Sequence, residues 1–470
     1  MMIPAGARVH FVGIGGAGMS AIASVLIARG YVVSGSDLRE SEVTRRLRTA
    51  GAQIQIGHAP EHVEPGQVVV ISRAVPEENV EVQMARRRGV QVLHRAEMLA
   101  GLMEGMRSIA VVGTHGKTTT TSMIARILEQ AGRDPTVLIG GEVDDFGGNA
   151  RAGRGEDLVA EVDESDGSLL RVAPEIAVVT NTDATDHLDY YGSIERVLET
   201  FRRFLQRLPA RGLAVICADS TVGRTLAEGV RGSGGARAVT FGLEPGADYA
   251  ARILEMAGWK TAFEVRRGPD LLGRATLSVP GEYNVQNALG ALAVGLEVGV
   301  PFASAASSLG TVRGVQRRFT VRGEVGGVLV VDDYAHNPTK VRSLLLAARR
   351  CWPQSRIIAV FQPHRYSRTR TVGPQFADAF DAAHEVIVTE LYAADEPSVP
   401  GVDAGVIVRA VRARRPVEYI AEAAQVVASL AERVGPGDLV LTIGAGDVWK
   451  IGDALLSSLR ARAAGVQGHG

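Results

Sequence analysis

The stretch GTHGKTTTT, residues 113–121, directly follows the apolar run SIAVV and decides much of what this chain can be. An apolar strand, a turn with two glycines and a helix with apolar residues at helical spacing form an arrangement that binds phosphate through backbone N–H groups. The strict pattern G-x-x-x-x-G-K-[ST] would need glycine at position 111, where the chain has Val111, so the predicted loop is shorter. We expect Lys117 to contact the β- and γ-phosphates and the Thr118 hydroxyl to serve Mg2+. An ordinary helix start is the structural alternative, and the glycines followed by four threonines disfavour it.

The composition predicts a soluble, globular protein of several domains. Its 470 residues exceed one ordinary core, and 46% of them are hydrophobic. Lys and Arg number 51 against 52 Asp and Glu, so no overall positive field indicates nucleic acid as a partner. Cys217 and Cys351 lie far apart and lack metal-ligand spacing, which is typical of a reducing cytoplasm. The apolar stretch 11–28 contains four glycines, so it predicts neither an export signal nor a membrane span. We expect a cytoplasmic protein with no nucleic-acid or membrane partner.

Short apolar runs alternate with segments of helical period along the whole chain, which predicts an α/β fold with parallel sheets. Strands are expected at RVHFVGIG, YVVSGSD and VVVISRAV in a first block, and at SIAVVG, DLVAEVD, IAVVTNT and LAVICAD in a second. The second block also contains ARILEMAGWKTAFEVRRG and RATLSVPG, expected as antiparallel strands added to the central sheet, and the glycine-rich GVRGSGGAR, expected as an exposed loop. A third block begins near RRFTVRGE. We place the domains at residues 1–104, 105–318 and 319–470.

A second glycine-rich turn, GIGGAG at residues 13–18, also lies between a predicted strand and a predicted helix and fits G-x-G-x-x-G. Asp37 stands at the end of the next predicted strand, where dinucleotide-binding folds carry an acid for the ribose. Taken alone, the pattern predicts NAD or FAD, but any pyrophosphate can accept hydrogen bonds from the same backbone N–H groups. A chain with this turn and a phosphate loop is better explained by two ligands: ATP and a substrate with its own diphosphate. A solvated strand-end residue is the alternative for Asp37.

Polar residues follow two neighbouring predicted strands, in the runs DLVAEVDESDGS and NTDATDHLD. The carboxyl ends of parallel strands are where open α/β sheets keep their ligands, so these residues are expected at one rim. Oxygen donors with one imidazole favour Mg2+ or Mn2+ over a structural zinc site. Solvated charges and helix caps are the alternative, which we favour for Asp166 and Asp189. The rim residues are Glu161, Asp163, Glu164, Asn181, Asp183, Asp186 and His187.

Together these segments resemble the Mur ligases of bacterial peptidoglycan synthesis, in register along nearly the whole chain. The resemblance rests on VHFVGIGGAGMSAIA, SGSD, GTHGKTTTT, EVDESDGS, TN…DHLD, PGEYNVQNALGA, GVQRRF, VDDYAHNPTKV, FQPHRYSRT and GAGDVWK. His115 makes the chain resemble the branch of the family that adds L-alanine, because the ligases for later amino acids usually carry Asn or Ser at this position. GIGGAGMS also looks more like this branch than like the ligase that reuses a preformed tripeptide.

The resemblance implies a Rossmann-like N-terminal domain, a central P-loop ATPase-type α/β domain and a Rossmann-like C-terminal domain that closes over ATP and the amino acid. It implies a ligase that joins L-alanine to the lactyl carboxylate of UDP-N-acetylmuramate through an acyl phosphate, at the expense of ATP. A monomer or weak dimer is expected. The UDP-sugar would be bound by Gly15, Gly16, Ala17, Gly18 and Asp37. ATP would be bound by Gly113, Thr114, His115, Gly116, Lys117, Thr118, Thr119, Asn284, Asn287 and His336. Mg2+ or Mn2+ would be held by Thr118, Glu161 and His187, the amino acid would be met by Tyr334 and Arg368, and catalysis would involve Lys117, His187, Arg365 and Arg368.

Several positions depart from the family pattern. NTDATDHLD has one residue more than usual before His187, which leaves the register of Asp183 open. None of the departures removes a residue that the chemistry needs. The other unusual positions are Tyr283 and Asn337, where His is common, Asp395, where Gly is expected, and Ser72-Arg73, where Ser-Ser is frequent.

Three other functions stay open on the sequence alone. An NAD-dependent oxidoreductase would use GIGGAG and Asp37 but would leave the phosphate loop and the acidic rim without a purpose. A nucleotide-driven regulator or transport ATPase would explain the phosphate loop alone. The tripeptide-recycling ligase would differ only in the amine that it accepts.

Overall fold

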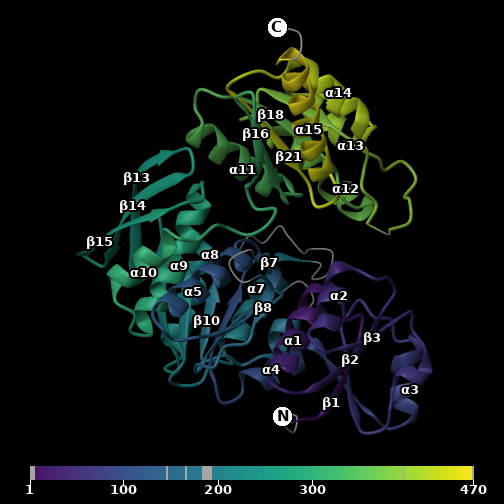
Figure 1. Cartoon of the computed structure of the whole chain (residues 1–470). Helices are drawn as coiled ribbons and strands as arrows, with labels where there is room; N and C mark the ends of the chain where they lie inside the picture. Colours follow the sequence, from purple (N-terminus) through teal and green to yellow (C-terminus); the bar gives the residue numbers. More distant parts are fainter. Residues whose placement is uncertain (1–5, 144–146, 165–166, 183–192, 395, 468–470) are drawn as a thin grey trace. The chain divides into compact units, whose positions relative to one another are not determined.

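The computed structural model describes residues 6–143, 147–164, 167–182, 193–394 and 396–467, and these residues form three sheets (Figure 1). The chain separates into two compact units. Unit 1 comprises residues 1–253, 263–276 and 284–313, and unit 2 comprises residues 254–262, 277–283 and 314–470. Unit 1 contains the first sheet and most of the second, and unit 2 contains the third.

The first sheet has five parallel strands in the order β3-β2-β1-β4-β5, which is the Rossmann order. Successive side chains of a strand face opposite sides of a sheet. Accordingly, Val9 and Phe11 of β1 belong to the core that includes α1 and α4, whereas Val12 packs with Ala85 of α3 on the other side. The elements are β1 (Arg8–Val12), α1 (Ala17–Ala28), β2 (Val32–Asp37), α2 (Glu42–Thr49), β3 (Gln53–Ile56), η1 (Pro60–His62), β4 (Gln67–Ile71), α3 (Val80–Arg87), β5 (Gln91–His94) and α4 (Arg95–Met103).

The second sheet has ten strands in the order β15-β14-β13-β12-β11-β10-β6-β9-β7-β8. Strands β12, β11, β10, β6, β9 and β7 run parallel, and β8 closes one edge as an antiparallel neighbour of β7. One continuous apolar cluster joins residues of α1, such as Leu26, to Ala110 of β6 and Phe201 of α7, so the first two sheets share a core. The elements are β6 (Arg107–Val112), α5 (Lys117–Gln130), β7 (Thr136–Val143), β8 (Gly148–Arg151), β9 (Asp157–Glu161), η3 (Ser168–Arg171), β10 (Ile176–Val179), α7 (Ile194–Leu205), β11 (Leu213–Cys217), α8 (Thr221–Gly232), β12 (Arg237–Gly242), β13 (Tyr249–Ala257), β14 (Lys260–Arg267), β15 (Asp270–Leu277), α9 (Glu282–Glu297) and α10 (Phe302–Leu309).

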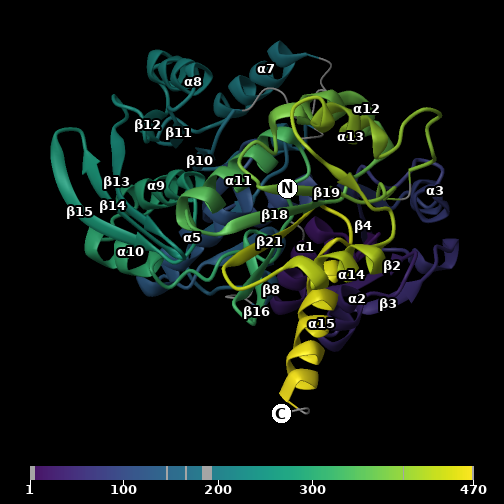
Figure 2. The same cartoon turned by 90° about the horizontal axis from the view of Figure 1, so that it is seen from above.

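The third sheet has six strands in the order β16-β17-β21-β18-β19-β20, parallel except for the edge strand β16. Ile357 and Phe361 of β18 face a core with α11, η4 and α13, and Ile358 and Val360 face a core with α14 and α15. Helices α14 and α15 pack side by side on that second face (Figures 1 and 2). The elements are β16 (Thr320–Val325), β17 (Val328–Asp333), α11 (Pro338–Cys351), β18 (Arg356–Phe361), α12 (Tyr366–Val372), η4 (Gly373–Asp378), β19 (Glu385–Val388), α13 (Gly405–Arg412), β20 (Glu418–Tyr419), α14 (Ala423–Arg433), β21 (Asp438–Ile443) and α15 (Trp449–Gln467).

The expected α/β class and the three sheet-forming blocks are confirmed. The prediction for GVRGSGGAR was partly wrong, because α8 continues to Gly232 and Val230 is buried on its inner face. Within the residues that the structure describes, no helix combines the length and apolar character needed to cross a membrane.

Candidate active site

The phosphate loop has the strand–turn–helix form that its sequence predicts. β6 ends at Val112, and α5 begins at Lys117 with Gly116 as its N-cap. Gly116 has a φ of 77°, in the left-handed region that favours glycine. A Cβ on Gly116 would also lie only 2.2 Å from Oδ1 of Asn287. The loop therefore needs glycine at this position for two independent reasons.

The ammonium group of Lys117 donates hydrogen bonds to two oxygens beside this loop. Its Nζ donates to the carbonyl oxygen of Gly113 at 2.7 Å and to Oε1 of Glu164 at 2.8 Å. The Glu164 side chain is 2% exposed, so the pair is removed from bulk water. Burial alone would lower the pKa of Lys117, but the carboxylates of Glu164, Asp163 and Glu161 outweigh burial and raise that pKa. The ammonium therefore stays charged and available to a polyphosphate.

Asparagine side chains from two other segments brace the loop. The backbone N–H of His115 donates to Oδ1 of Asn181 at 3.0 Å, and Nδ2 of Asn181 donates to the carbonyl of His115 at 2.8 Å. Asn287 of α9 accepts from the Thr120 hydroxyl at 3.3 Å and donates to Oδ1 of Asn284 at 3.3 Å. The structure thus places Asn287 against Gly116 and the start of α5, with Asn284 as its hydrogen-bonded neighbour, and it adds Asn181 as a direct partner of the loop backbone.

The first glycine turn connects β1 to α1, whose N-cap is Gly16. Oδ2 of Asp37 accepts a hydrogen bond from the backbone N–H of Gly15 at 2.8 Å. A Cβ on Gly15 would lie 2.8 Å from that same oxygen, so a side chain there would displace the Asp37 carboxylate. Asp37 therefore braces the turn itself, at the carboxyl end of β2.

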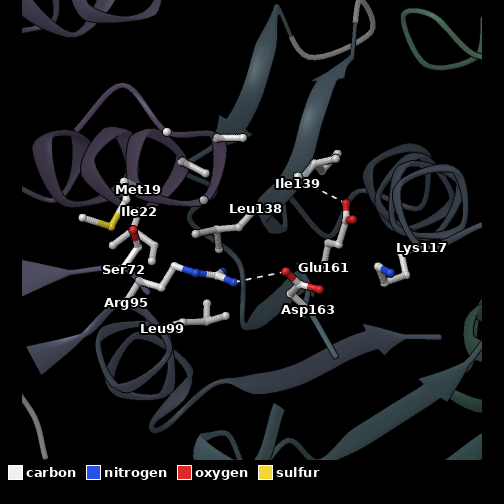
Figure 3. A pocket seen from close by; sticks show the side chains of 15 residues that line it. Met19, Ile22, Ser72, Arg95, Leu99, Lys117, Leu138, Ile139, Glu161 and Asp163 are labelled. Carbon is white, nitrogen blue, oxygen red and sulfur yellow. Dashed lines mark hydrogen bonds and ion pairs between the residues drawn. The ribbon is translucent and has the colours of Figure 1, made fainter. Parts of the chain in front are cut away.

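The first glycine turn and Lys117, the first residue of α5, line one pocket of unit 1, with a cavity volume of about 360 Å³ (Figure 3). This volume lies within the usual range of small-molecule sites. In Figure 3, Lys117 and Glu161 point into one part of the pocket, and Met19 and Ile22 of α1 line another. The lining residues are Gly16, Ala17, Gly18, Met19, Ala21, Ile22, Ser72, Arg95, Leu99, Lys117, Leu138, Ile139, Gly140, Glu161 and Asp163.

Arg95 is a pocket residue that the sequence analysis did not select. Its NH2 lies 3.5 Å from Oδ2 of Asp163, and the two side chains point toward each other in Figure 3. A Cβ on Gly18 would meet NH1 of Arg95 at 3.1 Å, so the guanidinium lies against the first glycine turn. Arg95 is the first residue of a helix and lies apart from both turns in sequence. The sequence around it therefore does not predict that its side chain lines the pocket.

Two of the three residues expected to bind a divalent cation, Glu161 and Thr118, are described in the structure and carry suitable oxygen donors. Oε2 of Glu161 accepts from the backbone N–H of Gly140 at 2.8 Å, and the same carboxylate lines the pocket beside Lys117. A carboxylate and the Thr118 hydroxyl are hard oxygen donors, which Mg2+ prefers, and Mg2+ commonly keeps several water ligands. His187, the third expected ligand, lies outside the described residues, as do Asp166, Asp183, Asp186 and Asp395. Among the residues that are described, no three His, Cys, Asp or Glu side chains gather in a geometry that could hold a metal ion.

The predicted residues of unit 2 lie together beyond the carboxyl ends of β17 and β18. Nδ1 of His336 lies 2.8 Å from the carbonyl oxygen of Tyr334, and the rings of His336 and His364 are 6.3 Å apart. NH1 of Arg368 is 2.9 Å from Nδ1 of His364. Arg365 has a φ of 69°, which is rare for a residue with a side chain, at the start of α12.

Positive charge dominates this cluster of unit 2. Burial, followed by Lys340 and Arg368, lowers the pKa of His336 well below its ordinary value. Burial and the arginines Arg368 and Arg365 lower the pKa of His364 to about 4. Both imidazoles are therefore neutral near pH 7, next to cations suited to an anionic ligand.

The sequence matches three family descriptions that together cover most of its length. Residues 8–107 match "Mur ligase family, catalytic domain", residues 111–295 match "Mur ligase middle domain", and residues 317–446 match "Mur ligase, glutamate ligase domain".

Relatives align over nearly the whole chain. The UDP-N-acetylmuramate–L-alanine ligase of Geobacter sp. (strain M21) is 47% identical over 456 residues, which cover 97% of this chain and 98% of that protein. The protein of the same name from Anaeromyxobacter dehalogenans (strain 2CP-1) is 48% identical over 455 residues, 96% of this chain and 98% of the relative.

Solved structures agree with these relatives. The UDP-N-acetylmuramate-alanine ligase MurC of Thermotoga maritima superposes with a TM-score of 0.80 at 30% identity, covering 97% of this chain and 100% of that one. A murein peptide ligase from Psychrobacter arcticus has a TM-score of 0.67 at 24% identity, with 97% and 99% covered, and so shares the fold.

Proposed function

The chain belongs to the Mur ligase family, and we propose that it joins L-alanine to UDP-N-acetylmuramate at the expense of ATP. The products are UDP-N-acetylmuramoyl-L-alanine, ADP and phosphate. Relatives that cover almost all of the chain at 47% and 48% identity carry the name of this activity. The observation that supports it best is that one pocket of unit 1 is lined by both the first glycine turn and the phosphate-loop lysine, because the reaction needs two phosphorylated molecules side by side.

The chemistry sets the demands on the protein. A carboxylate does not react with an amine in water, because its oxygen is a poor leaving group. The lactyl carboxylate oxygen first attacks the γ-phosphorus of ATP, which releases ADP and gives an acyl phosphate. The neutral amine of alanine then attacks the acyl carbon, and the tetrahedral species expels phosphate. Catalysis is therefore mainly positioning and charge neutralisation.

On the sugar-nucleotide side, we propose that the turn formed by Gly15, Gly16, Ala17 and Gly18 lies against the diphosphate. The N–H groups of Gly15 and Gly16 are engaged within the turn, so those of Ala17 and Gly18, at the start of α1, are the ones that would face it. A helix N-terminus favours an anion through its unpaired N–H groups and its dipole. Asp37 belongs to this site at the uridine end, where it also keeps Gly15 in place.

On the ATP side, we propose that the Lys117 ammonium leaves Glu164 for the transferring phosphate, since Lys117 itself lines the pocket. The positive charge of Lys117 would stabilise the phosphate most strongly in a site from which water is excluded. The remaining members of the proposed ATP site are Gly113, Thr114, His115, Gly116, Thr118, Thr119, Asn284, Asn287 and His336.

Thr118, Glu161 and His187 are the residues that would hold Mg2+ or Mn2+. A bound cation would neutralise charge on the phosphate oxygens. Glu161 fits this role because the hydrogen bond from the backbone N–H of Gly140 fixes its carboxylate in the pocket wall.

In the C-terminal domain, we propose that Tyr334 and Arg368 meet the amino acid and that Arg365 and Arg368 meet the developing phosphate charge. His187 and His336 are candidates to accept the proton that alanine loses. The low pKa of His336 keeps its ring in the neutral form that can accept one. We propose domain bounds of 1–104, 105–318 and 319–470, with the last closing over ATP and the amino acid during turnover.

We further propose a cytoplasmic monomer or weak dimer with no nucleic-acid or membrane partner. The nearly balanced charge, 51 basic against 52 acidic residues, supports the absence of a polyanionic partner.

Phosphate release with UDP-N-acetylmuramate, ATP, a magnesium salt and L-alanine tests the function directly. We expect turnover that stops when any one component, including the divalent cation, is left out. Replacing L-alanine with the tripeptide L-alanyl-γ-D-glutamyl-meso-diaminopimelate separates this function from tripeptide recycling. Faster turnover with the tripeptide would reject the proposal, and so would ATP hydrolysis that needs no sugar nucleotide.

A further inference from the structure

A buried carboxylate lies on the α3 side of the first sheet, outside the pocket lining. Glu81 of α3 is 0% exposed. Its Oε2 accepts from the Ser36 hydroxyl at 2.5 Å, and its Oε1 accepts from Nδ1 of His62 at 2.6 Å and from the backbone N–H of Ala59 at 3.2 Å. A carboxylate without solvent needs such donors, because an unpaired buried charge is strongly destabilising.

Two more imidazoles complete the surroundings of this carboxylate. Nδ1 of His58 and Nε2 of His10 lie 3.4 and 3.6 Å from its Oε2. His10 of β1 and Ser36 of β2 project to this side of the sheet because they alternate with residues that face α1.

The charge state of Glu81 determines which of its neighbours donate hydrogen bonds. Burial alone would raise the pKa of Glu81, but the nearby imidazole of His10 and the hydrogen bonds from Ser36 and His62 lower it to about 2. The ionised carboxylate can only accept, so the Ser36 hydroxyl donates to it and accepts from Nδ1 of His58, 2.9 Å away. Ser36 is thereby fixed from two sides.

The same residue also holds the first glycine turn through its backbone. The carbonyl oxygen of Ser36 accepts from the N–H groups of Gly13 at 2.8 Å and of Ile14 at 3.0 Å. The next residue, Asp37, accepts from the N–H of Gly15 at 2.8 Å. Three successive N–H groups of the turn are therefore engaged by the end of β2, and the N–H of Gly16 donates within the turn to the carbonyl oxygen of Gly13 at 3.2 Å. The N–H groups of Ala17 and Gly18, at the start of α1, are left to face the pocket.

We propose that Glu81 is a positioning residue for the diphosphate of the sugar nucleotide, acting through Ser36 on the glycine turn. The inference rests on the proposed function, since it assigns that diphosphate to the turn. A metal site is the other use for three imidazoles and a carboxylate, and the described residues offer no group with suitable geometry. Replacing buried charged groups with apolar residues is often neutral or stabilising, so the proposal assigns this carboxylate to the geometry that it imposes on β2 and not to stability.

Two variants and one control test the proposal in the full-length protein. Glu81→Gln keeps the shape but places an NH2 group against one set of donors, and Ser36→Ala removes only the hydroxyl that links Glu81 to β2. Glu78→Gln changes an exposed glutamate just before the same helix and serves as the control. KM and kcat are measured for each substrate, the affinity for UDP-N-acetylmuramate is measured by calorimetry, and folding is checked by thermal melting.

We expect both variants to raise KM and Kd for the sugar nucleotide by about tenfold, with kcat and the KM for ATP within about twofold of the wild type. The control should match the wild type. Unchanged sugar-nucleotide affinity in a folded Ser36→Ala protein would overturn the proposal, and so would equal losses for ATP and the sugar nucleotide. If Glu81→Gln does not fold, Ser36→Ala decides. A wild-type protein without turnover on UDP-N-acetylmuramate and L-alanine would instead refute the proposed function.

Discussion

Replacing Lys117 with methionine separates two roles of one charge. In the protein the ammonium neutralises Glu164, and in the proposed reaction it neutralises the transferring phosphate. Lys117→Met keeps much of the side-chain volume and removes the charge. We therefore expect both turnover and stability to fall, for different reasons.

The two losses can be estimated from the contacts. A unit charge about 4 Å from a phosphate oxygen at an effective dielectric constant of about 20 contributes roughly 4 kcal/mol. If that interaction forms only in the transition state, its loss lowers kcat by about 1,000-fold. Removing one partner of a buried ion pair costs about 3–5 kcal/mol, and Glu164 is 2% exposed.

A compensating variant distinguishes these effects. Lys117→Met/Glu164→Gln removes both charges, so we expect it to recover most of the thermal stability without turnover. Phosphate release and thermal melting are measured together, with calorimetry to confirm that UDP-N-acetylmuramate still binds. Lys450→Met is the control, because that lysine is 63% exposed in its pair with Asp447 and should cost at most about 1 kcal/mol. Turnover above a tenth of wild type in the double variant would refute the role of Lys117.

Three further predictions address the rest of the site. Gly116→Ala should weaken ATP binding by at least about tenfold, because its Cβ would meet Oδ1 of Asn287 at 2.2 Å in a left-handed backbone; titration with an ATP analogue measures it. Arg365→Ala and Arg368→Ala should each lower kcat by about 10- to 1,000-fold while sugar-nucleotide affinity holds, and unchanged kinetics for ATP and alanine alike would remove both from the site. The pKa of His364 is lowered to about 4 from 6.5, so the unfolded chain binds a proton first as the pH falls and stability decreases between pH 6.5 and 4. Melting curves of His364→Gln should show a shallower decrease over that window; the same slope as wild type would contradict the assignment.

The sequence predicted those parts of the site that depend on neighbouring residues. The phosphate loop and the first glycine turn each combine an apolar strand, glycines and a helix within about fifteen residues, and both have the predicted form. The position of Glu161 at a strand end also followed from local pattern.

Contacts between distant residues left no such signal. Glu164 was placed at the rim, but its bond to Lys117 joins residues 47 positions apart, and the pattern of either segment does not reveal the other. From its sequence context, Glu81 is expected to be an exposed polar residue of a surface helix. In the structure it is buried against β1 and β2. The glycines of GVRGSGGAR, residues 229–237, suggested a loop, whereas the structure continues α8 to Gly232 with Val230 buried. Tertiary packing decided each of these cases.

The most direct measurement is a crystal structure of the full-length protein grown with UDP-N-acetylmuramate and a non-hydrolysable ATP analogue. The account predicts the uridine diphosphate on the backbone of residues 15–18 and the γ-phosphate within hydrogen-bonding distance of Nζ of Lys117, with both ligands bound in the same molecule. A first glycine turn without uridine diphosphate, or one that takes NAD in its place under the same conditions, would contradict it.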